Sequence, residues 1–126
     1  MNKAPGHQKW PDHQVTEQPA GRRMRVRVND EIVAESDDVI RVDEDDSPVR
    51  YYFPREDVRM EKLQSSATIT QCPFKGSARY FDLRTDSRRL PDAVWSYEEP
   101  YDEHQDLCGR VAFYDDKLPE IKVGFE

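Results

Sequence analysis

The chain has 126 residues, of which 36% are apolar and 36% are charged, and its formal net charge at pH 7 is −7. This length suits a single domain with a compact core. The net negative charge argues against nucleic acid as the main partner, because binding to a phosphate backbone depends on clustered Lys and Arg. No apolar run approaches the ~20 residues that a membrane-spanning helix needs, so we expect no membrane partner.

The N-terminus and the cysteines predict a cytoplasmic protein. The first residues lack the apolar segment of a secretion signal. The sequence has two cysteines, Cys72 and Cys108, which we expect to be free thiols in a reducing compartment. Two cysteines are too few for a four-cysteine zinc site, and we predict no metal and no cofactor. The sequence leaves the oligomeric state open.

Residues 1–21 are expected to form an irregular N-terminal lead-in. Pro5, Pro11 and Pro19 fall in a polar stretch without an apolar period. The pattern changes after Gly21, and we expect residues 22–126 to form one β domain.

The first strand of that domain is predicted by strict alternation. Met24, Val26 and Val28 alternate with arginines, which is the periodicity of a strand with two different faces. Asn29-Asp30 is a two-residue turn candidate that tolerates positive φ. Residues 32–35 then read as the returning strand of a hairpin.

The rest of the chain continues this pattern. Further strands are predicted over residues 39–42, 49–53, 67–71, 78–84, 93–97, 111–114 and 121–125, with Ala93, Trp95 and Tyr97 on one face. Short helices are predicted at residues 54–57 and from an Asp102 cap to Gly109. The expected fold class is mainly β and antiparallel, with one or two short helices.

Four ordered motifs resemble those of the domain of unknown function family 427 (DUF427). The motifs are Tyr51–Met60, Cys72–Gly76, Ala93–Tyr97 and Val111–Tyr114. The resemblance implies a two-sheet, β-tent-like domain similar to cereblon's thalidomide-binding domain, methionine sulfoxide reductase B and the Yippee proteins. Some of those relatives hold zinc through paired cysteines, which are missing here, so the resemblance implies a zinc-free version. Gln71 and Phe81 stand where the family often has histidine and tryptophan.

Cys72 and Lys75 are candidate catalytic residues. An ammonium group beside a thiol favours the thiolate, and Pro73 and Gly76 would fix the turn between them. The alternative is a buried cysteine at a strand end, with Lys75 exposed to solvent. Nothing in the sequence places Cys108 near Cys72.

The aromatic residues of the motifs form the second candidate site, because small-molecule sites are apolar clefts with a few placed polar groups. The candidate ligand-binding residues are Tyr52, Asp57, Lys75, Tyr80, Trp95, Tyr97 and Tyr114. Tyr97 and Tyr114 are favoured, since a buried phenol needs a hydrogen-bond partner. The alternative is that most of these rings belong to the core. For Asp57, which lies between Arg55 and Arg59, the alternative is a helix-capping carboxylate with surface ion pairs.

Three charged patterns are predicted to be structural or solvated. The arginines at positions 22, 23, 25 and 27 are read as the solvated face of an edge strand. The acidic run Asp43–Asp46 is read as a solvated loop. His7, His13 and His104 are too dispersed along the chain to predict a metal site.

Three functions remain open from the sequence. The leading hypothesis is a protein that binds a small polar or aromatic ligand in an aromatic-lined cleft, with Cys72 at its rim. The alternatives are a thiol-based enzyme that uses Cys72, and a protein-interaction module that uses an exposed strand or the arginine stripe.

Overall fold

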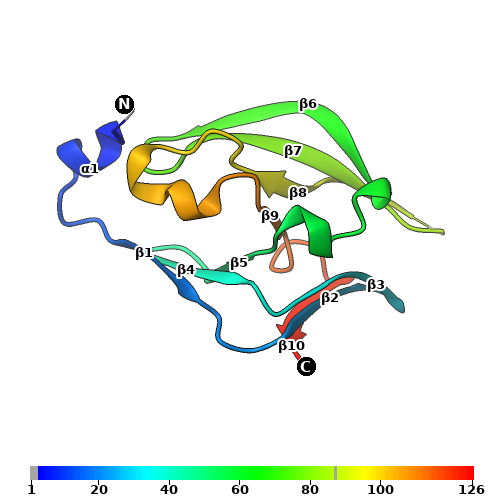
Figure 1. The fold of residues 1–126 in the computed structure, drawn as a ribbon. Coiled ribbons are helices and arrows are strands. Elements are labelled where there is room, and N and C mark those ends of the chain that lie inside the picture. Colours follow the sequence, from blue (N-terminus) through cyan, green and yellow to red (C-terminus); the bar gives the residue numbers. More distant parts are fainter. Residues whose placement is uncertain (1–2, 87) are drawn as a thin grey trace.

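The computed structural model describes residues 3–86 and 88–126. It contains ten strands, one short α-helix and three 3₁₀ helices in the described residues (Figure 1). The strands are β1 (Val15–Pro19), β2 (Met24–Val28), β3 (Glu31–Ser36), β4 (Ile40–Glu44), β5 (Arg50–Tyr52), β6 (Leu63–Cys72), β7 (Gly76–Arg84), β8 (Arg89–Ser96), β9 (Val111–Phe113) and β10 (Ile121–Phe125). The helices are α1 (Pro5–Lys9), η1 (Arg55–Asp57), η2 (Met60–Lys62) and η3 (Asp102–Leu107).

The strands form three antiparallel sheets, with the orders β1-β4-β5, β10-β2-β3 and β6-β7-β8-β9. The prediction of a mainly β, antiparallel protein is confirmed. The number of sheets differs from the two that the resemblance implied, because β5 and β9 meet only at an isolated bridge between Phe53 and Val111. That bridge connects the edges of the first and third sheets, which lie on opposite sides of the molecule in Figure 1.

The segment before Gly21 contains α1 and β1, although its residues show no apolar periodicity. β1 pairs with β4 from Val15↔Glu44 to Pro19↔Ile40. Proline fits there because β1 is an edge strand. The Gly6 N–H donates to the Pro73 carbonyl at 2.8 Å, and a Cβ on Gly6 would lie only 2.7 Å from that oxygen. Contacts with the body of the domain therefore order this segment, and local sequence does not reveal them.

The predicted hairpin of β2 and β3 is present, with Asn29 at φ +55° in its turn. The interpretation of the arginine stripe as the face of an edge strand is wrong, because β10 pairs with the other side of β2. Arg25 forms ion pairs with Glu35 on β3 and with Glu126 just beyond β10. Arg25 and Arg27 thus lie on the middle strand of a sheet, and Arg22 and Arg23 come just before that strand.

The two predicted helical segments are also present, as η1 and η3. The Asp102 cap is wrong, since Tyr101 holds the cap position and no side chain caps that helix. The Gln105 amide instead donates to the Pro100 carbonyl at 2.6 Å. Gly109 follows the helix at φ +74°.

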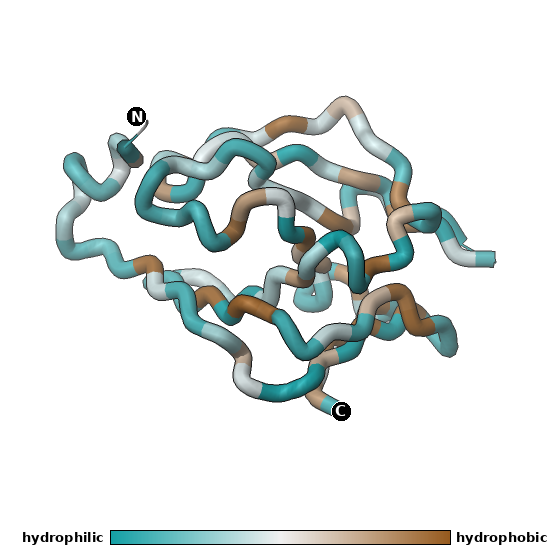
Figure 2. The backbone as a smooth tube through the Cα atoms, viewed as in Figure 1, coloured by the Kyte–Doolittle hydropathy of each residue, from teal (hydrophilic) through white to brown (hydrophobic). Residues whose placement is uncertain are grey.

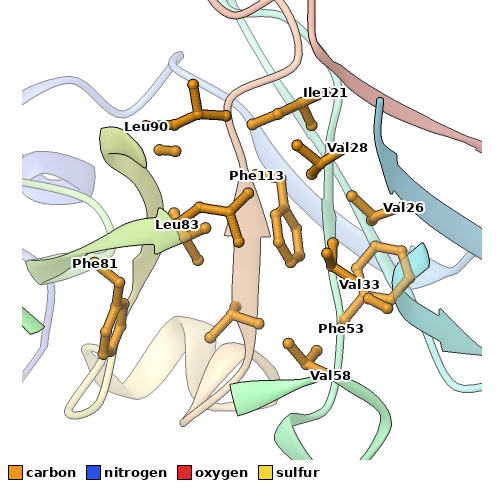
Figure 3. Packing of buried hydrophobic residues seen from close by; sticks show 14 of the residues in the cluster. Val26, Val28, Val33, Phe53, Val58, Phe81, Leu83, Leu90, Phe113 and Ile121 are labelled. Carbon is orange, nitrogen blue, oxygen red and sulfur yellow. The ribbon is translucent and has the colours of Figure 1, made fainter. Parts of the chain in front are cut away.

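The core has two clusters that share the β6–β9 sheet. The larger one fills the space between this sheet and the β10-β2-β3 sheet, and Phe113 lies between Leu83 and Val33 within it (Figure 3). The smaller cluster lies against the β1-β4-β5 sheet and contains Tyr52, Trp95 and Tyr97. Hydrophobic residues concentrate on the strands and the connecting loops are mainly hydrophilic (Figure 2).

Candidate functional site

Strand register brings most of the predicted ligand-binding residues to one face of the β6–β9 sheet. Tyr80 pairs with Trp95, and Trp95 pairs with Ala112. Directly opposite residues share a face, so these side chains point together toward the smaller core cluster. Ala93 packs in the larger cluster instead, although it was predicted to share a face with Trp95. The register of the β7–β8 pairing shifts between Phe81 and Leu83. This irregularity explains why Ala93 and Trp95 pack in different clusters.

The buried part of this face is an interlocked set of rings. The Trp95 indole Nε1–H donates to the Tyr52 hydroxyl at 3.0 Å, and the two rings meet edge to face. The Trp95 and Tyr114 ring centroids are 4.2 Å apart. Burial raises the pKa of the Tyr52 and Tyr97 hydroxyls well above the usual value. Tyr52, Trp95 and Tyr97 are therefore core residues that support their neighbours from behind.

Tyr80 and Tyr114 instead line a surface hollow, which we call the Tyr80–Tyr114 hollow. It has a volume of about 340 Å³. Its lining residues are Thr68, Thr70, Tyr80, Pro91, Asp92, Tyr114, Lys117 and Leu118. The two tyrosine rings are nearly parallel, at 10°. Their hydroxyls lie 3.3 Å apart, and the Tyr80 hydroxyl also lies 3.0 Å from the Thr70 hydroxyl.

Two charged groups stand at the Tyr80–Tyr114 hollow. The Lys117 ammonium lies 4.7 Å from the centre of the Tyr114 ring, in cation–π geometry. The Asp92 carboxylate accepts hydrogen bonds from the Ser66 and Thr68 hydroxyls, at 2.6 and 2.7 Å. Burial, together with the neighbouring Tyr80 phenol, raises the pKa of Tyr114. The Tyr114 hydroxyl is therefore a neutral hydrogen-bonding group at physiological pH.

Lys75 and Cys72 lie at the other end of the same cluster, near the turn between β6 and β7. The Lys75 side chain is only 8% exposed, and its ammonium forms an ion pair with Glu44. The Cys72 sulfur accepts a hydrogen bond from the Lys75 backbone N–H at 3.4 Å. The side chain that was predicted to activate the thiol is thus paired with a carboxylate. Cys72 and Cys108 are both free thiols.

Glu44 is the residue of this region that sequence reasoning missed, because it lies in an acidic run that was read as a solvated loop. It also accepts a hydrogen bond from His13 at 3.0 Å. Burial raises the pKa of the Glu44 carboxyl, but the hydrogen bonds and charges of Lys75 and His13 outweigh it and leave that pKa below its usual value. No local signal marks Glu44 among its acidic neighbours.

Asp57 does not join the aromatic site. Its carboxylate accepts a hydrogen bond from the Ser36 hydroxyl at 2.6 Å, and it lines a separate hollow with β3 residues. Arg55, its neighbour in sequence, donates instead to the Gly109 carbonyl and to Glu98. The grouping of Asp57 with the tyrosines therefore finds no support in the geometry.

Two of the three histidines, His7 and His104, meet in the folded chain. His7 and His104 lie 2.8 Å apart through their Nε2 atoms, and the His104 Nδ1 lies 2.5 Å from the Glu17 carboxylate. His13 stacks on Phe74, with ring centroids 4.1 Å apart. Among residues 3–86 and 88–126, no three His, Cys, Asp or Glu side chains are grouped as a metal ion would require.

The fold and the aromatic face define a small antiparallel β domain with one shallow aromatic hollow among its surface features. The chain belongs to the family described as a domain of unknown function, DUF427, whose sequence profile matches residues 16–124. No curated protein matches the chain. Within the described residues, no helix has the length and apolar character needed to cross a membrane.

Proposed function

We propose that this protein binds a small polar or aromatic ligand in the Tyr80–Tyr114 hollow. The carrying observation is that the Tyr80–Tyr114 hollow combines two partly exposed tyrosine rings, three hydrogen-bonded hydroxyls and two charged groups. Ligand sites in proteins pair apolar surface with a few placed polar groups, and their volumes start at about 300 Å³. The Tyr80–Tyr114 hollow falls at the small end of that range, which suits a ligand of about one ring.

The residues behind the Tyr80–Tyr114 hollow support this proposal because they hold Tyr114 in place. The Trp95 ring packs against Tyr114, and the hydrogen bond from Trp95 to Tyr52 fixes the Trp95 ring in turn. The Arg50 guanidinium lies over both Trp95 and Tyr114, and pairs with Asp116. A binding surface that is ordered before the ligand arrives loses less entropy on binding.

The proposed site is smaller than the cleft that the sequence predicted. Tyr80 and Tyr114 contact the ligand directly, and Trp95 and Tyr52 act from behind. Lys75 and Tyr97 lie at the end of the cluster that the β1-β4-β5 sheet covers, where Lys75 is held by Glu44. The thiol of Cys72 has no part in the proposal.

The proposal is tested by amide chemical-shift perturbation in two-dimensional NMR. The probes are indole, benzoate, benzamidine, adenosine, glucose and N-acetylglucosamine, each added at millimolar concentration. We expect at least one of them to shift the amides of Thr70, Tyr80 and Tyr114. Tyr114→Ala should weaken that binding roughly tenfold or more, since stacking on an aromatic side chain contributes about 1–3 kcal/mol.

Tyr101→Ala is the matched control, because Tyr101 is a half-buried tyrosine outside the Tyr80–Tyr114 hollow. Tyr80→Phe removes only a hydroxyl and keeps the ring, so it tests the site with little risk to folding. The proposal is wrong if no probe shifts these amides, or if binding is equally strong in Tyr114→Ala, Tyr80→Phe and Tyr101→Ala.

A further inference from the structure

We propose that the ligand of the Tyr80–Tyr114 hollow is a saccharide, bound as a single uncharged pyranose ring. This inference rests on the proposed function and specifies its ligand class. It is drawn from the kinds of polar groups in the Tyr80–Tyr114 hollow, from their number, and from the directions from which they come.

The first argument is the chain of hydroxyls. The hydroxyls of Thr70, Tyr80 and Tyr114 are joined by two hydrogen bonds. Each hydroxyl donates one hydrogen bond and accepts two, so the chain keeps one free donor and several free acceptors. A sugar hydroxyl has the same double capacity, and can therefore extend this chain in either direction. A ligand with acceptors alone would use only the one donor.

The second argument is the Asp92 carboxylate. Its oxygens accept hydrogen bonds from Ser66 and Thr68. A carboxylate has about four acceptor positions, so two remain. Two adjacent hydroxyls of a sugar ring match this remaining capacity.

The backbone around Asp92 is built to aim this carboxylate. Asp92 has φ +50°, which is uncommon for a residue other than glycine. Register shifts occur nearby in both the β6–β7 and the β7–β8 pairings, and bulges of this kind redirect side chains. The Asp92 N–H donates to the Asp82 carboxylate at 3.0 Å, and Arg89 holds that carboxylate from another side.

The third argument is charge and direction. Lys117 and Asp92 are the two charged residues of the lining, and their charges cancel, which favours an uncharged ligand over a phosphorylated one. The polar groups come from β6, from β7, from β8 and from the segment between β9 and β10. A flat heterocycle presents its hydrogen-bonding groups in one plane, whereas a pyranose presents hydroxyls around its ring. Its C–H face packs on the tyrosine rings, which lie nearly parallel.

The test compares two groups of probes on the intact protein by the same NMR titration. The saccharides are glucose, galactose, mannose, N-acetylglucosamine and cellobiose, and the aromatic compounds are indole, benzoate, benzamidine and adenosine. We expect a saccharide to shift the amides of Thr68, Asp92 and Tyr114. Asp92→Asn should weaken saccharide binding roughly tenfold or more, because hydrogen bonds to a charged group are stronger than those to a neutral amide.

Asparagine tolerates positive φ, so Asp92→Asn keeps the backbone of the site. Asp102→Asn, on the exposed surface of η3, is the control and should leave saccharide affinity unchanged. If only aromatic compounds shift these amides, the saccharide proposal fails and the proposed function stands. If neither group shifts them, both fail. Equal saccharide affinity in Asp92→Asn and wild type would overturn the role assigned to Asp92.

Discussion

The Nε2 atoms of His7 and His104 lie 2.8 Å apart, although the two residues are 97 positions apart in the sequence. One hydrogen lies between these nitrogens, so one ring donates and the other accepts. The His104 Nδ1 faces the Glu17 carboxylate at 2.5 Å, so Nδ1 carries a hydrogen that it donates. The simplest arrangement of the uncharged rings then has His7 donate to His104. This chain of contacts joins α1, β1 and η3.

The first prediction is that His7→Ala releases the N-terminal segment. Removing His7 leaves a nitrogen of the buried His104 ring without its partner, which costs about 1–3 kcal/mol. We expect the Gly6 amide, which donates to the Pro73 carbonyl, to exchange with solvent faster by roughly tenfold or more. Hydrogen exchange followed by NMR measures this.

Lys9→Ala is the control for this prediction, because Lys9 is exposed on the same short helix. Its Gly6 exchange rate should match that of the wild type. An unchanged Gly6 rate in His7→Ala would show that the imidazole contact does not hold α1.

A second prediction concerns the ion pair of Lys75 and Glu44, which connects the β6–β7 turn to the end of β4. Lys75→Met leaves the half-buried Glu44 carboxylate with His13 as its remaining partner. Breaking one side of a buried ion pair costs about 3 kcal/mol or more, and we expect a loss of about that size in urea unfolding. The double variant Lys75→Met/Glu44→Gln should recover part of it. If the loss of unfolding free energy in the double variant equals the sum of the losses in the two single variants, the pairing is contradicted.

A third prediction is the acid dependence of this pair. The pKa of Glu44 is lowered in the folded protein, so the unfolded chain takes up the proton at a higher pH than the folded one. The carboxylate therefore stabilises the fold above the unfolded pKa of about 4.3, and this contribution is lost as the pH falls through the folded pKa. The stability difference between wild type and Glu44→Gln should be largest near neutral pH and shrink below about pH 4. A constant difference across that range would contradict it.

A fourth prediction concerns alkaline pH. Tyr52, Tyr97 and Tyr114 have raised pKa values, and the protein has six tyrosines. The unfolded chain loses these phenolic protons near the ordinary pKa of about 10, whereas the folded chain keeps them, so stability should fall as the pH rises above about 10. Ultraviolet absorbance of phenolate should show three tyrosines that ionise only when the protein unfolds. Six tyrosines that ionise together in the folded protein would refute this.

A fifth prediction separates ligand binding from thiol chemistry. Cys108 is exposed, and its thiol donates to the Glu98 carbonyl at 3.3 Å, whereas Cys72 is half-buried in the aromatic cluster. We expect a maleimide probe to label Cys108 well before Cys72, with mass spectrometry of peptides as the readout. Cys108→Ser should abolish the fast phase. Faster labelling of Cys72 would instead support the thiol-enzyme hypothesis.

Local sequence was sufficient to predict the strands and turns whose partners are close to them in the chain. The alternation of Met24, Val26 and Val28 predicted β2, and Asn29 predicted the turn that follows it. The same signals could not show that β2 is a central strand, because its second partner, β10, lies about a hundred residues later. The helix α1 could not be predicted from local sequence either, since its contacts are with Pro73 and His104.

The candidate site shows the same division. The prediction grouped Tyr80, Trp95 and Tyr114 because all three are aromatic residues of the motifs, and the pairing of Tyr80 with Trp95 places those two side chains on one face. Which of these rings remain accessible depends on where β5 packs, and no local pattern records that. Glu44 illustrates the limit most clearly, because only the folded chain distinguishes it from the other acidic residues of its run.

The placement of β10 beside β2 also has a consequence for the order of events during protein synthesis. The hairpin of β2 and β3 leaves the ribosome long before residues 121–125 do, and until then one edge of β2 lacks its partner. The arginines on that strand keep its open edge charged, which discourages pairing with other nascent chains. We therefore expect the sheet to close only after residues 121–125 have left the ribosome, and its completion to coincide with burial of Ile121 in the larger core cluster.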